Sequence, residues 1–212
     1  MLAAAILAAG ESRRMGAPKA LLPFGGISFL EHLIEVTRHP RIGVVRVVLG
    51  AHATEICEKL HLDAAMIVVN ENWREGQLSS IQAAIRALPS EARPRRAKEG
   101  LSATADMEGV LLCPVDHPLI SSALVAQLIE RFEASAKLIA LPTYHGRRGH
   151  PVIFRASLFS ELLAASPDVG ARQVVWAHAA DVLEVPTEEE GVILNLNDPA
   201  SLDRALPRMP NQ

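Results

Sequence analysis

Aromatic residues are scarce in this chain of 212 residues, where five Phe, two Trp and one Tyr make up 4%. Any core must therefore be aliphatic, and a hydrophobic fraction of 49% is enough to build one. Cysteine is scarcer still, with two residues, which excludes a disulfide scaffold. Cys57 and Cys113 lie in apolar stretches without the paired spacing of metal ligands, and we interpret both as reduced core thiols.

The chain also lacks a dominant charge and a long apolar run. Its 21 basic and 24 acidic side chains give a net charge of −3, so we expect no nucleic-acid partner, which would require a broad basic excess. No run approaches the roughly 20 apolar residues of a membrane span. The apolar start of the chain has no charged segment before it, unlike a signal peptide. We therefore expect a cytoplasmic protein without a membrane partner.

What the chain does contain is an alternation of strand-like and helix-like stretches. Strands are predicted over 3–7, 44–50, 65–70, 109–114 and 137–142, and helices over 28–39, 78–88 and 121–132. Ser28 and Glu31 have the spacing of a capping box. This alternation predicts an α/β fold with a mostly parallel sheet. Strands that are apolar throughout are typical of a sheet covered on both faces.

Four unusual loops follow predicted strands, at 8–19, 70–80, 114–118 and 143–150. Ligands of open α/β sheets bind outside the carboxyl ends of the strands, so we expect these loops to meet at one edge. The stretch 89–108 contains few large apolar residues and two prolines. We predict that it is an exposed or disordered insertion, whose basic side chains are solvated or grip an anion.

The first of these loops, LAAGESRRMGAPK, is rich in glycine and positive charge. Gly10 and Gly16 permit close approach of the backbone to an anion, while Arg13, Arg14 and Lys19 supply the charge that a triphosphate requires. The spacing matches neither a Walker A loop nor a GxGxxG fingerprint. The alternative is a polar turn with solvated arginines.

Further motifs follow the opening stretch LAAGESRRMGAPKALLPFGG in order: NENWREGQLSSI, CPVDHPLI, GRRGHPVIF, PDVGARQVV and LNLNDPASL. Together they resemble nucleotidyltransferases that use nucleoside triphosphates, and most closely the molybdenum cofactor cytidylyltransferase group. The resemblance implies a three-layer α/β/α, Rossmann-like fold of the nucleotide-diphospho-sugar transferase type. It implies one domain, 1–212, with a nucleotide half of about 1–120 and an acceptor half of about 121–212; the insertion has no counterpart.

The same resemblance implies roles for individual residues. Catalysis is assigned to Arg14, Lys19 and Asp116. The residues expected to bind the nucleotide are Leu7, Ala8, Ala9, Gly10, Ser12, Arg13, Arg14, Gly16, Lys19, Asn70, Gly76 and Ser79. Those expected to bind the acceptor are Gly149, His150, Pro151, Asp168 and Arg172.

A Mg²⁺ site is predicted at Asp116. This carboxylate follows a buried strand between Pro114 and Pro118, which fix the shape of the loop, and Mg²⁺ takes one or two protein oxygens plus phosphate and water. Asp116 as a helix cap is the alternative, for which Ser121 or Ser122 is better placed. The second ligand is expected to be Asn197, with Asn195 on the same face of a terminal strand as the alternative. Asp198 and Pro199 are an N-cap and a first helical turn in another interpretation.

Several side chains carry two interpretations. His150 either packs or contacts an acceptor phosphate, and Asp168 and Arg172 either form an i,i+4 pair or leave Arg172 free to grip the acceptor. Trp73 either stacks on the base or anchors its loop. Gln77 stands where the family commonly has methionine, which leaves its role open. Ser79 either forms a hydrogen bond to the ribose or base, or caps a helix.

The reaction implied is attack of an acceptor phosphate on the α-phosphorus of a nucleoside triphosphate, with release of pyrophosphate. LAAG and PFGG resemble the cytidylyl branch of the family and so favour CTP as donor. The resemblance as a whole implies a molybdopterin-type acceptor, with a molybdoenzyme or its chaperone as a candidate protein partner. The alternatives are a guanylyltransferase for the same cofactor and a nucleotidyltransferase for a sugar or alditol phosphate. A cofactor-binding chaperone or nucleotide sensor is the non-enzymatic alternative.

Overall fold

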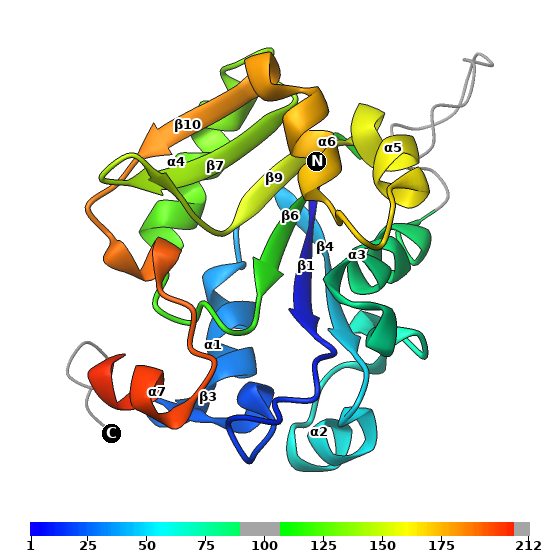
Figure 1. Cartoon of the computed structure of the whole chain (residues 1–212), viewed down its shortest axis with the longest axis vertical. Helices are drawn as coiled ribbons and strands as arrows, with labels where there is room; N and C mark the ends of the chain where they lie inside the picture. Colours follow the sequence, from blue (N-terminus) through cyan, green and yellow to red (C-terminus); the bar gives the residue numbers. More distant parts are fainter. Residues whose placement is uncertain (90–106, 206–212) are drawn as a thin grey trace.

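The computed structural model describes residues 1–89 and 107–205, which form an eight-stranded sheet and a small two-stranded one (Figure 1). Along the large sheet the order is β10-β7-β9-β6-β1-β4-β5, with β8 paired to β7. The strands are β1 (Leu2–Ala8), β4 (Ile42–Leu49), β5 (Ile67–Val69), β6 (Gly109–Pro114), β7 (Ile139–Tyr144), β8 (Arg147–Arg148), β9 (Val152–Arg155) and β10 (Val182–Pro186). The small sheet pairs β2 (Pro23–Phe24) with β3 (Ile27–Ser28). The mostly parallel sheet predicted from the sequence is confirmed.

One central strand, β9, runs against its neighbours. It is antiparallel to both β6 and β7, whereas β1 is parallel to β4 and β6, and β7 is parallel to β10. The cause is local. The turn at His145 and Gly146, both with positive φ, reverses the chain into β8 too tightly for the crossover that a parallel strand needs.

Helices cover both faces of the sheet, which confirms the three-layer α/β/α arrangement. The α-helices are α1 (Phe29–Val36), α2 (Ala53–Lys59), α3 (Gln77–Arg86), α4 (Ser122–Glu133), α5 (Phe159–Ala164), α6 (Arg172–Ala177) and α7 (Pro199–Ala205). Short 3₁₀ turns are η1 (Lys19–Leu21), η2 (Ala64–Met66), η3 (Trp73–Glu75), η5 (Ala156–Leu158), η6 (Ala179–Asp181) and η7 (Glu190–Ile193). Helices α1 and α4 pack on one face, and α3, α5 and α6 pack on the other.

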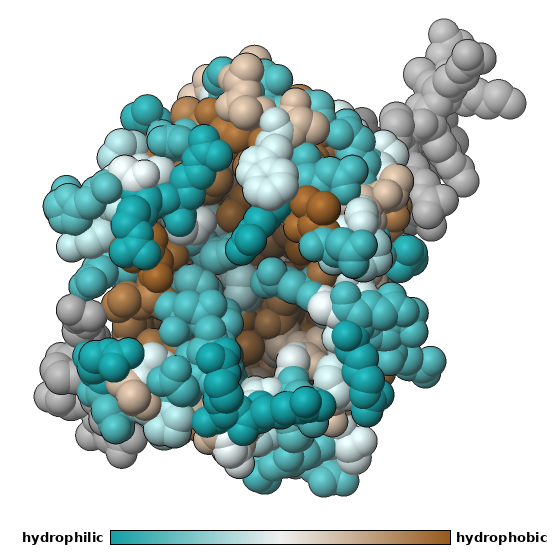
Figure 2. All heavy atoms as spheres, viewed as in Figure 1, coloured by the Kyte–Doolittle hydropathy of each residue, from teal (hydrophilic) through white to brown (hydrophobic). Residues whose placement is uncertain are grey.

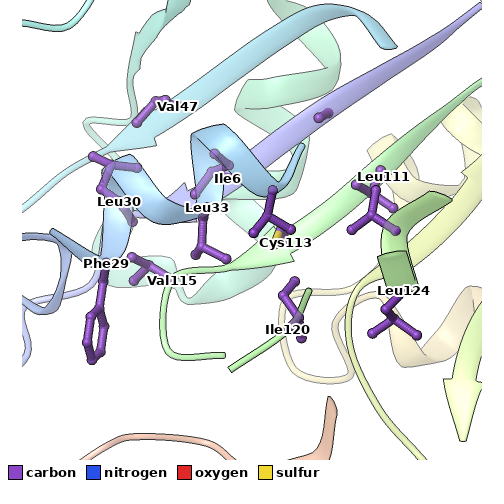
Figure 3. Packing of buried hydrophobic residues seen from close by; sticks show 14 of the residues in the cluster. Ile6, Phe29, Leu30, Leu33, Val47, Leu111, Cys113, Val115, Ile120 and Leu124 are labelled. Carbon is purple, nitrogen blue, oxygen red and sulfur yellow. The ribbon is translucent and has the colours of Figure 1, made fainter. Parts of the chain in front are cut away.

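The core is divided by the sheet into two mainly aliphatic clusters, with Phe29 and Phe132 buried in the first and Phe154 in the second. Along β1, Ala4 and Ile6 face the first cluster, while Ala3 and Ala5 face the second. Figure 3 shows the first cluster, where Leu33 of α1 and Leu111 of β6 lie among the labelled side chains. Both cysteines are free thiols; Cys113 is buried in this cluster and Cys57 packs against it, as predicted.

Capping residues fix two helix starts as the sequence indicates. The Ser28 side chain accepts from the Glu31 backbone N–H, and the Glu31 carboxylate accepts from the Ser28 backbone N–H at 2.8 Å, which completes the predicted capping box of α1. Ser121 caps α4 by accepting from the Leu124 N–H at 3.0 Å.

Two other expectations have different outcomes. The prediction of a terminal strand around Asn195 and Asn197 is wrong, because residues 194–198 do not pair with the sheet. The peptide N–H of Leu196 donates instead to the carbonyl of Asp116 at 2.8 Å. Most of the predicted insertion, 90–106, lies outside the described residues. Within 1–89 and 107–205, no helix has both the length and the apolarity to cross a membrane.

Close packing at Gly50 yields the first prediction. A methyl group there would lie 2.6 Å from the Ala9 carbonyl oxygen and 2.7 Å from Trp73 Cβ, whereas at Gly10 it would meet nothing within 4 Å. We expect Gly50→Ala to lower the free energy of unfolding by about 1–3 kcal/mol through overpacking. Gly10→Ala, the matched control, should change it by less than about 1 kcal/mol. Urea unfolding followed by far-UV circular dichroism measures both, and equal stability of the two variants would contradict the packing argument.

Candidate functional site

A cavity of about 410 Å³ opens at the carboxyl ends of β1 and β6. Figure 2 shows this face hollowed at its centre, with hydrophilic side chains around the rim and hydrophobic side chains at depth. Its lining comes from all four loops that follow predicted strands, and includes Ala9, Gly76, Asp116 and His150. The expected meeting of these loops at one edge of the sheet is therefore confirmed.

The glycine-rich loop is held in a fixed shape beside this cavity. Ser12 adopts a positive φ of 54°, its carbonyl accepts from the Met15 N–H at 2.9 Å, and its hydroxyl accepts from the Lys19 N–H at 3.2 Å. The ring of His52 contacts the carbonyl oxygen of Glu11 at 2.9 Å. These bonds close the loop around Gly10 and Ser12, which both line the cavity.

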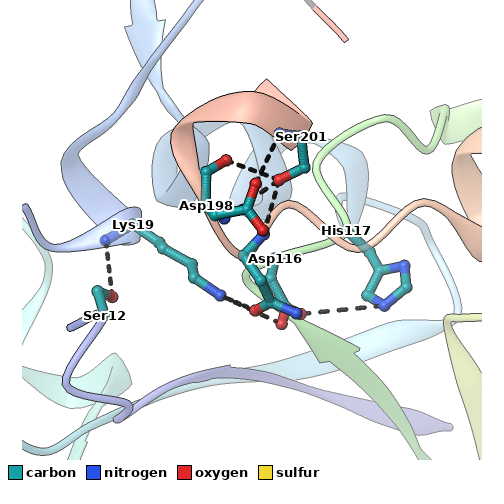
Figure 4. Close-up of polar contacts among 7 residues, drawn as sticks. Ser12, Lys19, Asp116, His117, Asp198 and Ser201 are labelled. Atoms are coloured by element: carbon teal, nitrogen blue, oxygen red, sulfur yellow. Dashed lines mark hydrogen bonds and ion pairs between the residues drawn. The ribbon is translucent and has the colours of Figure 1, made fainter. Parts of the chain in front are cut away.

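The charged centre of the cavity is the Lys19 ammonium, which points toward Asp116 (Figure 4). Asn197 is its other hydrogen-bond partner. Lys19 Nζ lies 3.5 Å from Asp116 Oδ2 and also donates to Asn197 Oδ1. Burial lowers the pKa of Lys19, and the carboxylate of Asp116 opposes that shift. One ammonium thus contacts both side chains predicted to be metal ligands, and it neutralises the carboxylate of Asp116.

The segment that carries Asn197 is fixed to the loop of Asp116 and then capped. The Leu196 N–H donates to the carbonyl of Asp116, and two residues later the Asp198 carboxylate accepts from the Ser201 N–H at 2.7 Å. Asp198 and Pro199 therefore begin α7, as the alternative interpretation predicts. This hydrogen bond is the main reason that the pKa of Asp198 is lowered. Asn195 lines the cavity and Asn197 reaches it through Lys19.

The two arginines of the glycine-rich loop differ in their ion-pair contacts. Arg13 is exposed and pairs with Glu11 at 2.7 Å, so its side chain is already neutralised. Arg14 is exposed, and its positive charge contributes to lowering the pKa of both Lys19 and Asp198. Neither arginine, nor Gly16, lines the cavity as the structure describes it, so their phosphate-binding role stays a prediction.

The loop 70–80, which is predicted to bind the nucleotide, is held in place by buried hydrogen bonds. The Asn70 amide donates to Ser79 Oγ at 2.9 Å and to Ser80 Oγ at 3.0 Å, and its oxygen accepts from the Asn72 N–H. Ser79 also bonds the carbonyl oxygen of Gly76, and does not cap α3. Gly76 and Ser80 line the cavity, whereas Asn70 and Ser79 lie behind it; binding by these residues stays a prediction.

Two histidine rings lie between Asp116 and the acceptor side. The rings of His117 and His150 are 4.8 Å apart, and both Nδ1 atoms are buried without a hydrogen-bond partner among the described residues. Desolvation lowers the pKa of His117 and lowers that of His150 to about 4. Sequence reasoning missed His117, which neighbours Asp116 in the chain and is only 5% exposed. Its adjacency to a predicted ligand was the only available signal.

A second cavity, of about 520 Å³, adjoins the first. The two share Leu7, Gln77, Pro114, His150 and Arg172. The predicted acceptor residues Gly149, His150, Asp168 and Arg172 line this second cavity, and Pro151 is buried beside it. No ion pair joins Asp168 to Arg172 in the described part of the chain, so the i,i+4 alternative is wrong.

The packing of Trp73 fits the loop-anchor interpretation and leaves the stacking one open. It lines the first cavity, is half-buried against the second core cluster, and carries the Arg74 guanidinium 4.2 Å above its ring.

Comparison with known proteins identifies relatives along most of the chain. The family model described as "MobA-like NTP transferase domain" matches residues 4–182. Nicotine blue oxidoreductase of Paenarthrobacter nicotinovorans is 31% identical over 197 residues, covering 88% of each chain. Probable molybdenum cofactor guanylyltransferase of Mycobacterium avium (strain 104) is 31% identical over 215 residues, covering 97% of this chain and 94% of the relative.

Solved structures support the fold. The crystal structure of Rv0371c from Mycobacterium tuberculosis H37Rv matches with a TM-score of 0.79 at 24% identity, covering 98% of this chain and 99% of that one. A complex of the same protein with manganese matches with a TM-score of 0.74 at 23% identity, covering 97% and 98%.

The desolvation of the His150 ring leads to a prediction about pH. Its pKa of about 4 in the folded protein lies below the ordinary 6.5, so between these values the unfolded state binds a proton that the folded state does not. The free energy of unfolding should therefore fall as the pH falls from 6.5 to about 4, and His150→Asn should reduce that slope. Urea unfolding across this range measures it, with NMR titration of the ring protons as the direct check. A His150 ring that titrates above pH 6 would contradict the prediction.

Proposed function

This chain belongs to the MobA-like NTP transferase domain family, and we propose that it is a nucleotidyltransferase for a molybdopterin-type acceptor. The reaction joins an acceptor phosphate oxygen to the α-phosphorus of a nucleoside triphosphate, and pyrophosphate leaves. The observation that carries the proposal is the meeting of Lys19 and Asp116 beside the glycine-rich loop in one cavity, where Lys19 also donates to Asn197. Ammonium, carboxylate and amide groups suit a polyphosphate and its counter-ion, which favours transfer over the oxidoreduction in the name of the Paenarthrobacter relative.

The donor set fits a hard divalent cation. Asp116 offers carboxylate oxygens and Asn197 an amide oxygen, which are ligands that Mg²⁺ and Mn²⁺ accept. Among residues 1–89 and 107–205 there is no cluster of three or more His, Cys, Asp or Glu side chains that could hold a metal, so a bound ion would take its remaining ligands from phosphate and water. When bound, the ion neutralises charge on the phosphates. The manganese complex of Rv0371c makes Mn²⁺ a suitable probe.

The chain's own residues do the positioning. In the proposal, Lys19 and Arg14 bind the phosphates and offset the charge that grows on leaving pyrophosphate. A phosphate monoester acceptor is already ionised near neutral pH, so no general base is required. The chemistry therefore depends on holding two anions in line, which is a task for cations and hydrogen-bond donors.

The second cavity favours a large, partly apolar acceptor. Its deep wall is aliphatic and aromatic, formed by residues that include Leu112, Leu141 and Phe154, while Arg172 stands at the junction with the first cavity. A flat heterocycle with a phosphate tail matches this distribution better than a sugar or alditol phosphate, whose hydroxyl groups would meet apolar walls. A molybdopterin-type compound has that shape.

The donor nucleotide has two candidates. We retain CTP on the sequence Leu7-Ala8-Ala9-Gly10, whose residues line the first cavity. GTP is the second candidate, because the Mycobacterium avium relative carries the name of a guanylyltransferase. Transfer of the product to a molybdoenzyme or its chaperone, and a cytoplasmic location, are part of the same proposal.

Pyrophosphate release tests the proposed function. We expect the protein with Mg²⁺, molybdopterin and either CTP or GTP to release pyrophosphate, and Asp116→Asn to lower kcat by roughly 100-fold or more. Asp203→Asn on α7, an exposed carboxylate that lines neither cavity, is the control and should retain activity. Nucleotide binding without any pyrophosphate release would identify a sensor or chaperone and overturn the proposal.

The contacts of Lys19 predict opposite effects on metal and nucleotide. Its ammonium occupies oxygens of Asp116 and Asn197, so Lys19→Met should raise Mn²⁺ affinity without nucleotide by roughly two- to fivefold, the worth of a modest ion pair. The same variant should weaken nucleotide binding. Lys59→Met, which removes an exposed partner of Glu55, is the matched control and should change neither. Electron paramagnetic resonance of free Mn²⁺ gives the affinities, and unchanged Mn²⁺ binding by Lys19→Met would reject the competition.

A further inference from the structure

The two cavities meet at a small junction. Leu7 and Pro114 form its apolar part, and Gln77, His150 and Arg172 are the side chains that carry polar groups there. A donor in the first cavity and an acceptor in the second can react only where the two spaces join. Polar groups at the junction are therefore positioned to touch the reacting phosphates.

The fold directs Gln77 to this place. Gly76 has a positive φ of 96°, which ends η3 and starts α3 at the next residue. Gln77 is the first residue of α3 and is exposed, whereas its neighbour Leu78 is 4% exposed and packs in the core. The turn thus buries one side chain and leaves the other at the border of both cavities.

The amide of Gln77 is also free to bind. Its side chain makes no hydrogen bond to the described part of the chain. In contrast, the amide of Gln82 donates to the carbonyls of Leu162 and Leu163, and Gln173 accepts from the Ser166 N–H. Those two glutamines serve the fold, while Gln77 has an unused donor and acceptor at the junction.

The other polar side chains that line both cavities indicate the chemistry of the ligand. Arg172, at the first position of α6, is exposed and makes no ion pair with described residues. The half-buried ring of His150 has an unpaired Nδ1 atom. Arg148, by contrast, is neutralised by Glu184 at 2.8 Å. A free guanidinium and a free amide on the lining that both cavities share suit the oxygens of a phosphate ester.

We propose that Gln77 is a substrate-contacting residue whose amide N–H binds the acceptor phosphate beside Arg172, at the point of transfer. This assignment rests on the proposed function. There, an acceptor phosphate oxygen forms a bond to the α-phosphorus, and the bond from that phosphorus to the bridging oxygen breaks. Its electron pair leaves with pyrophosphate. Gln77 holds the attacking phosphate in place and exchanges no proton.

Gln77→Met tests the assignment, because methionine keeps the length of the side chain and removes its hydrogen bonds. With molybdopterin, Mg²⁺ and whichever of CTP or GTP supports turnover, we expect kcat/KM for molybdopterin to fall roughly 10- to 100-fold, as for a lost hydrogen bond to a charged group. Gln77→Glu should lose more, because its carboxylate repels the phosphate. The Kd of the nucleotide, measured by calorimetry without acceptor, should stay within about twofold. Gln127→Met on α4, exposed and lining neither cavity, is the matched control.

The outcomes separate the two proposals. A wild-type protein without turnover would overturn the proposed function and this assignment with it. Wild-type turnover that Gln77→Met and Gln77→Glu leave unchanged would overturn the assignment alone. A weaker nucleotide Kd with an unchanged kcat/KM for molybdopterin would place Gln77 on the nucleotide, and would equally overturn it.

Discussion

The parallel pairing of β1 with β4 and β6 is the constraint on which the site depends. Leu7 is in register with Val48 on one side and Pro114 on the other, so three strands end at nearly the same level. Their continuations are the glycine-rich loop, the close contact at Gly50 and the loop of Asp116. Small side chains make this possible, because the alanines of β1 let helices pack closely on both faces of the sheet.

Electrostatic balance follows from that arrangement. A carboxylate that enters a partly buried cavity needs a counter-charge, and Lys19 supplies one from the opposite loop. The same ammonium pays a desolvation cost of its own, which lowers its pKa. Anionic ligands and a cation that arrive together can redistribute these contacts without leaving a charge unpaired. In the proposed function, separate arrival of either one would leave the site unbalanced, so the binding of nucleotide and metal would be coupled.

Much of this could be predicted from the sequence, where local patterns dominate. Apolar runs marked the strands, Ser28 with Glu31 marked the start of α1, and loops after strands marked the edge that holds the cavity. What escaped prediction depends on contacts distant in sequence. The segment around Asn197 looks like a strand in the sequence, yet the N–H of Leu196 donates to the carbonyl of Asp116 and not to a neighbouring strand. His117 looks like an ordinary loop residue until the tilted contact of its ring with the ring of His150 is known.

The arginines show why a charge count does not locate a ligand. Arg13 and Arg148 stand in promising motifs, but Glu11 and Glu184 already neutralise them. Arg172 has the same chemistry and no ion-pair partner among the described residues, because α6 begins at that residue and projects it over the junction of the cavities. Only the folded arrangement distinguishes an arginine that stabilises the surface from one that is available to a substrate. Availability, rather than residue type, therefore decides which side chains at this edge of the sheet can take part in transfer.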